Sequence, residues 1–113
     1  MRKLLLTIAL AALSSGVWAG SVYTKGQLNN MVSRGEYPAQ GPVTNTQTRQ
    51  LSFPDCKVTV ESVMSALRGE YPVRTVVDTS IIYMVKAWTN DGAVIATCSK
   101  PDRKLVLTQA SYL

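Results

Sequence analysis

The stretch from Ser52 to Cys98 constrains the fold of this chain more than any other. It contains both cysteines of the sequence, Cys56 near its start and Cys98 at its end. Cys56 follows a helix-start signal, whereas Cys98 closes a run with the composition of a strand. We predict that the two cysteines form a disulfide, which joins one helix to one sheet.

The first residues show the three parts of a secretory signal. A basic start is followed by an apolar run over residues 4–13, and small residues precede the expected cleavage point. This apolar run is too short for a membrane span, which needs about 20 residues. We predict that residues 1–19 are a signal peptide cleaved after Ala19, that no membrane span remains, and that the mature protein is periplasmic or secreted.

Removing this leader leaves residues 20–113, which we predict to form a single small domain. A domain of this size is close to the lower limit of what a hydrophobic core can stabilise alone. In an oxidising compartment, Cys56 and Cys98 are therefore expected to pair, which would stabilise the fold by about 4 kcal/mol. A free reactive thiol is the alternative, although neither cysteine lies in a Cys-x-x-Cys motif.

The mature chain is only mildly basic. The 12 basic residues include Arg2 and Lys3, so loss of the leader leaves 10 against 7 acidic residues, a net charge of +3. The remaining basic residues are scattered, apart from a short group at Lys100, Arg103 and Lys104 that we interpret as a solvated turn. Nucleic-acid binding favours clustered basic residues, so we predict no nucleic-acid partner.

Two segments are predicted to be helices. In the longer one Ser52 is the N-cap, and Asp55 follows three residues later as in a capping box. Val58 points away from the apolar face of this helix. A shorter helix is capped by Thr24 and stopped by Gly35. The residues expected on the buried face of the longer helix are Phe53, Cys56, Val60, Val63, Met64 and Leu67.

The second half of the chain has the pattern of strands joined by tight turns, with Asn90-Asp91-Gly92 as a hairpin signal. Consecutive strands with such turns are expected to pair antiparallel. Residues 41–50 lack apolar periodicity, and we interpret them as a loop or irregular edge. We therefore predict an α+β fold: a main amphipathic helix on a three- to four-stranded antiparallel meander, a short N-terminal helix and one disulfide. The expected strands are residues 73–77, 81–89, 93–99 and 104–108.

Alternation along the expected strand 93–99 distinguishes the two faces of the sheet. Val94, Ala96 and Cys98 share one side of this strand, which must face the disulfide-linked helix. The opposite side carries Ile95 and is not conspicuously polar. We expect either the short N-terminal helix or a partner to cover it.

The segment Arg34-Gly35-Glu36-Tyr37-Pro38 recurs unchanged at Arg68-Gly69-Glu70-Tyr71-Pro72. One interpretation is that both copies are helix stops, because Gly and Pro end helices. The other is a partner-binding surface, because Tyr and Arg are enriched at binding hot spots. Lys86, in the middle of a predicted strand and near Trp88, is a further candidate for partner contact. The candidate partner surface comprises Arg34, Tyr37, Arg68, Tyr71, Lys86 and Trp88.

The sequence offers little chemistry for catalysis. It contains no histidine, which is the commonest general base and metal ligand. It also lacks a Gly-rich phosphate loop and metal-ligand spacing. Glu36 and Glu70 occupy the same position in the two copies of the repeat, and they are the one candidate pair of carboxylates for hydrolysis. We expect a protein that is not an enzyme and has no metal or cofactor, with a small carboxylate-dependent hydrolase as the remote alternative.

These expectations favour a non-catalytic exported binding or accessory protein of the bacterial cell envelope, serving for instance a secretion, conjugation or surface-assembly apparatus. The alternative is a periplasmic inhibitor or immunity protein that blocks an enzyme. The mature charge of +3 argues against an inhibitor of basic muramidases, for which an acidic surface would give better steering. Both classes imply a protein partner, and the sequence leaves homo-oligomerisation open.

Overall fold

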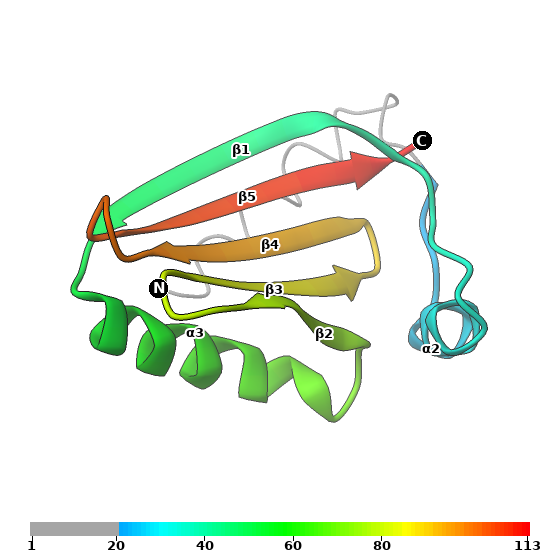
Figure 1. The fold of residues 1–113 in the computed structure, drawn as a ribbon. Helices are drawn as coiled ribbons and strands as arrows, with labels where there is room; N and C mark the ends of the chain where they lie inside the picture. Colours follow the sequence, from blue (N-terminus) through cyan, green and yellow to red (C-terminus); the bar gives the residue numbers. More distant parts are fainter. Residues whose placement is uncertain (1–20) are drawn as a thin grey trace.

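The computed structural model describes residues 21–113 of the chain (Figure 1). The predicted signal peptide, residues 1–19, lies outside the described residues. No helix within residues 21–113 is long and apolar enough to cross a membrane. The elements in chain order are α2 (Lys25–Ser33), β1 (Gln40–Gln50), α3 (Phe53–Arg68), β2 (Val73–Asp78), β3 (Ile82–Thr89), β4 (Gly92–Ser99) and β5 (Lys104–Tyr112).

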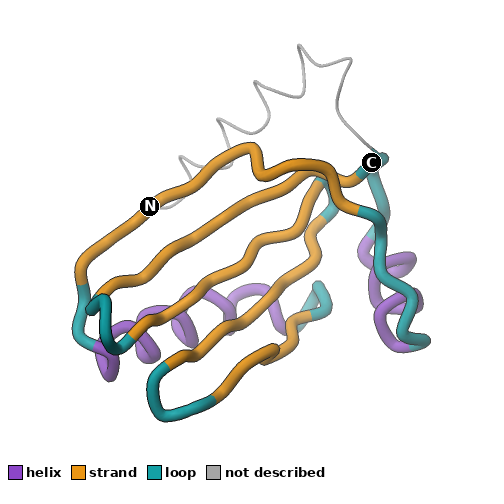
Figure 2. Tube along the Cα trace, turned by 45° about the horizontal axis from the view of Figure 1, so that its top comes forward, coloured by secondary structure: helices purple, strands orange, loops and turns teal. Residues whose placement is uncertain are grey.

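The five strands form one antiparallel sheet in the order β1-β5-β4-β3-β2. Strands β2 to β5 are the predicted meander, joined by tight turns, and the α+β class is confirmed. Figures 1 and 2 show α3 running along one face of the sheet, whereas α2 lies at one end of it.

The sheet is larger than predicted, because β1 occupies the segment interpreted as a loop or irregular edge. This strand pairs with β5 from Gln40 opposite Tyr112 to Gln50 opposite Lys104. Its threonines suit an extended backbone, but nearly all of its residues are exposed. A strand exposed on both faces has no apolar alternation to detect. Its partner is also the last strand of the chain, so no local signal predicts the pairing.

The predicted main helix is α3, and Ser52 is its N-cap: the Ser52 hydroxyl accepts the backbone N–H of Asp55 at 3.3 Å. Val58 is exposed, as predicted. Val63 was expected to be buried, but it is 50 % exposed. The buried face of α3 is narrower than the sequence pattern implied. Its buried residues recur every four positions, and Val63 lies beside this row, at the edge of the contact with the sheet. The fully buried members of the row are Cys56, Val60 and Met64.

Cys56 and Cys98 form the predicted disulfide, with an S–S distance of 2.03 Å. The bond joins α3 to β4 inside the main core, where the two cysteines are 1 % and 0 % exposed. Ala96 is buried in the same core and Val94 packs against it, so the predicted inner face is confirmed. The strand residues that complete this core are Tyr83, Val85, Ala87 and Leu105.

The predicted short helix is α2, and it covers one end of the opposite face of the sheet. Thr24 caps it: the Thr24 hydroxyl accepts the backbone N–H of Gln27, and the Gln27 side chain accepts the backbone N–H of Thr24. Leu28 and Val32 are buried in a second, smaller core. The rest of this face stays half-buried, so α2 covers it only in part. The sheet residues of the second core are Trp88, Ala93 and Tyr112.

Candidate functional site

The two copies of the repeated segment end the two helices in different ways. Gly35 ends α2 in the left-handed region, with a φ of 74°. Its N–H donates to Val32 and that of Glu36 donates to Met31, which is the bonding of a Schellman motif. Gly69 follows α3 with a φ of −76°, which is ordinary helical backbone. One interpretation of the repeat was that both copies stop a helix; a helix does end at each copy, but only the first ends through a left-handed glycine.

The charged residues of the two copies also have different partners. Arg34 and Glu36 pair with each other within the first copy, at 2.9 Å. In the second copy, Arg68 pairs with Glu61 of α3 at 2.8 Å, and Glu70 pairs with Lys25 at the start of α2. The two glutamates therefore lie in separate ion pairs. Within residues 21–113 no three His, Cys, Asp or Glu side chains gather as metal ligands would.

Arg68 is held by a small network that also reaches the sheet. Glu61 accepts hydrogen bonds from the Arg68 guanidinium and from the hydroxyl of Tyr83. These two bonds, Arg68 first, hold the pKa of Glu61 below its ordinary value of 4.5. Arg68 was a candidate contact residue, and the structure places its charge in this helix-to-sheet link.

The ionised Glu61 carboxylate stabilises the fold above its ordinary pKa of 4.5, and this contribution is lost as the pH falls through the lowered folded-state pKa. Glu61→Gln should lower the stability at pH 7 by less than about 1 kcal/mol, because solvent screens a partly exposed pair. The difference from wild type should shrink as the pH falls below 4.5. Urea denaturation between pH 3 and pH 7 measures this, with Glu36→Gln as control because Glu36 pairs only with nearby Arg34. A difference that stays constant over the pH range would contradict the assignment.

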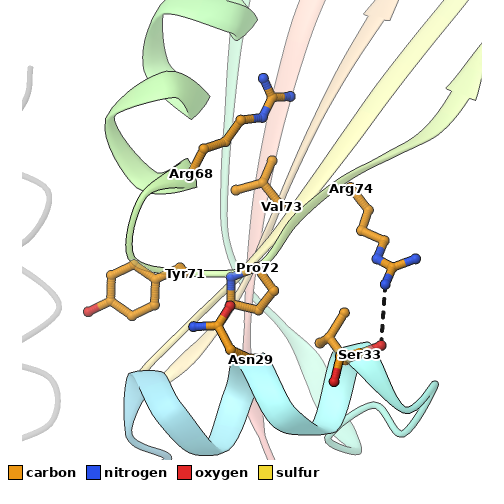
Figure 3. Close-up of a pocket in the computed structure, with 8 residues that line it drawn as sticks. Asn29, Ser33, Arg68, Tyr71, Pro72, Val73 and Arg74 are labelled. Carbon is orange, nitrogen blue, oxygen red and sulfur yellow. Dashed lines mark hydrogen bonds between the residues drawn. The ribbon is translucent and has the colours of Figure 1, made fainter.

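Tyr71, the tyrosine of the second copy, is fixed in the smaller core. Its hydroxyl donates to the side-chain oxygen of Asn90, and the Asn90 amide donates to the Tyr23 carbonyl at 2.7 Å. Tyr71 also borders an open pocket of about 320 Å³. Figure 3 shows side chains reaching this pocket from the end of α3, the start of β2 and α2. Arg74 closes one side by donating to the Val32 carbonyl at 3.3 Å.

Tyr37, the tyrosine of the first copy, lies on a different surface together with two other predicted contact residues. Its ring stacks on Trp88, with a centroid distance of 5.3 Å and an angle of 25° between the planes. The Lys86 ammonium lies 5.0 Å from the centre of the Trp88 ring. Trp88 is buried, while Tyr37 is 51 % exposed. The structure thus brings together Tyr37, Lys86 and Trp88, whereas Arg68 and Tyr71 border the other pocket.

Tyr37, Lys86 and Trp88 line an open pocket of about 380 Å³ on the face of the sheet opposite α3. Sequence reasoning missed Arg74, which is on β2 directly opposite Lys86 of β3. The one feature of the sequence that could have indicated Arg74 is its positive charge within a predicted strand of β-branched residues. We call this site the aromatic–cationic pocket; its lining residues are Tyr37, Arg74, Thr75, Val76, Lys86 and Trp88.

The aromatic–cationic pocket carries two positive charges without an acidic counterpart. Among residues 21–113, neither Arg74 nor Lys86 is in an ion pair. The Lys86 ammonium bonds to the neutral side chain of Gln40, and burial lowers the pKa of Lys86. Within the same part of the chain, the Trp88 indole N–H is the one buried side-chain polar group without a hydrogen-bond partner. The pocket can therefore supply positive charge and an aromatic surface.

Comparisons of this chain with protein-family models, with curated proteins and with solved structures find no match.

Proposed function

We propose that this protein is an exported, non-catalytic binding protein of the bacterial cell envelope, and that the aromatic–cationic pocket contacts its protein partner. The observation that carries this proposal is the half-exposed Tyr37 ring stacked on the buried Trp88, with Lys86 over the same indole. Tyrosine, tryptophan and arginine dominate the binding energy of protein interfaces. A buried aromatic base with an exposed aromatic above it is a preorganised contact.

Two further observations support export and an envelope location. The disulfide Cys56–Cys98 suits an oxidising compartment outside the cytoplasm, where such bonds persist. The amino-terminal sequence has the composition of a secretory signal. An accessory role in a secretion, conjugation or surface-assembly apparatus is the specific form of function that we propose.

A photoreactive amino acid placed at Tyr37 in the native host tests the proposal. Irradiation should give one dominant protein adduct, because the Tyr37 ring is half exposed at the centre of the proposed contact. The matched control is the same photoreactive residue at Val58, which is 69 % exposed on α3. The Tyr37 adduct should decrease when unmodified protein is co-expressed in excess, and Val58 should give no such adduct.

The outcomes of this experiment separate the candidate functions. An adduct with an envelope component supports the accessory role, whereas an adduct with one soluble enzyme favours an inhibitor. Equal labelling from Tyr37 and Val58, or an adduct that excess protein does not displace, would contradict a specific contact at this pocket.

A further inference from the structure

We propose that the aromatic–cationic pocket recognises a carboxylate side chain on an extended, acidic segment of the partner protein. This inference rests on the proposed function, because it specifies the chemistry by which the same surface selects its partner. It is carried by Arg74 and Lys86, two cations without an acidic partner among residues 21–113, and by the aromatic surface beside them.

The positions of the two cations are unfavourable in the absence of a ligand. Arg74 and Lys86 are directly opposite each other on adjacent strands and on the same face of the sheet. Like charges in such a cross-strand pair destabilise a sheet. Lys86 is partly buried as well, and desolvation adds to the cost of its charge. An anion between the two side chains would offset both costs.

The groups around the pocket suit a carboxylate. A guanidinium presents a planar set of donors that matches the two oxygens of a carboxylate, and the Lys86 ammonium adds a point charge. Trp88 and Tyr37 together form an apolar wall for the carbon atoms of the ligand side chain.

The neighbouring strand favours a peptide over a free anion or a lipid headgroup. Strand β2 is an edge of the sheet and contributes Thr75 and Val76 to the pocket. The backbone N–H of Trp88 donates to the Pro72 carbonyl at 3.1 Å, so the Pro72 carbonyl faces β3. By the alternation of an antiparallel ladder, Arg74 faces β3 too and Thr75 turns its N–H and carbonyl outward. An extended segment can add to this edge while its acidic side chain reaches the cations.

Trp88 provides a local spectroscopic readout of binding. The chain contains two tryptophans, Trp18 and Trp88. A full chain carrying Trp18→Phe, expressed with its own leader, therefore reports on Trp88 alone. The probes are the peptide acetyl-Ala-Glu-Val-Glu-Ala-amide, the same peptide with Gln in place of Glu, inorganic phosphate, and vesicles containing phosphatidylglycerol.

The Glu peptide should shift the Trp88 emission in a saturable way, and the Gln peptide should bind at least about tenfold more weakly, since hydrogen bonds to charged groups are worth the most. Arg74→Gln and Lys86→Gln should each weaken Glu-peptide binding by about tenfold or more. Lys86→Arg should retain binding, which separates loss of charge from loss of folding. Arg49→Gln on exposed β1 is the matched control and should leave binding unchanged.

Several results would overturn the inference. Equal binding of the Glu and Gln peptides would exclude carboxylate recognition. Binding of phosphate or of the vesicles as tightly as the Glu peptide would assign the pocket to a free anion or to a membrane surface. No change in Trp88 emission with any probe would also count against it. If Arg74→Gln combined with Lys86→Gln still gives the Tyr37 crosslink in cells, the partner contact stands and only the charge recognition is wrong.

Discussion

Replacing both cysteines, by Cys56→Ala together with Cys98→Ala, should lower the free energy of unfolding by about 4 kcal/mol. The two residues are 42 positions apart, so the disulfide closes a long loop in the unfolded chain and reduces its conformational entropy. The bond joins α3 to β4, and it is the one disulfide within residues 21–113. Both cysteines are buried in the main core, so the substitutions also remove packing there.

Thermal unfolding followed by circular dichroism measures this effect. For a domain of this size, each kcal/mol shifts the melting temperature by about 4–8 °C, so the double variant should melt about 15–30 °C below the wild type. Reduction of the wild-type protein with dithiothreitol should reproduce most of the loss. Val58→Ala on the exposed side of α3 is the control and should melt close to the wild type. If the double cysteine variant also melted close to the wild type, the disulfide would not contribute to holding α3 on the sheet.

Gly92→Ala should be the most disruptive glycine-to-alanine substitution among residues 21–113, costing about 3 kcal/mol. A Cβ atom at this position would lie 2.5 Å from the carbonyl oxygen of Ala110 on the adjacent strand β5. That neighbour is backbone, so relief of the clash requires β4 and β5 to move apart. The same region is tied by the Tyr112 hydroxyl, which donates to the carbonyls of Thr89 and Gly92 at 2.7 and 3.0 Å.

Urea denaturation compares this substitution with Gly26→Ala. A Cβ atom on Gly26 has its nearest neighbour at 4.0 Å, and the residue lies inside α2, where alanine is favoured over glycine. Gly26→Ala should therefore leave the stability unchanged or raise it by up to about 1 kcal/mol. Equal midpoints for the two variants would show that β4 and β5 separate at little cost, against the close approach described above.

Much of the fold followed from local patterns. Ser52 and Asp55 mark the start of α3, and Asn90-Asp91-Gly92 marks the β3–β4 hairpin; both signals act within a few residues of the chain. The pairing of Cys56 with Cys98 followed from cysteine count and the expected compartment. The prediction for Val63 was wrong, because periodicity gives the direction of a helix face but not the width of the contact it makes.

The candidate site could be predicted only in part. Tyr37, Lys86 and Trp88 stood out as residue types typical of contacts, yet nothing local placed Tyr37 on Trp88, which lies 51 positions further along the chain. Arg74 was missed because its significance depends on lying opposite Lys86, and that register exists only once β2 pairs with β3. The functional assignment itself and the cleaved leader remain predictions.

The sequence by itself determined the elements whose signals are local: two capped helices, a disulfide that links helix to sheet, and a meander of tight turns. Tertiary structure alone decided that residues 40–50 become β1, because the energy of that strand comes from hydrogen bonds to β5 more than 50 residues further along. It likewise decided that two copies of one pentapeptide acquire different roles, since the half-exposed Tyr37 ring stacks on the buried Trp88 from outside, whereas the Tyr71 hydroxyl is bonded to Asn90. Local propensity is a property of the residue, whereas register and burial belong to the pairing of distant segments.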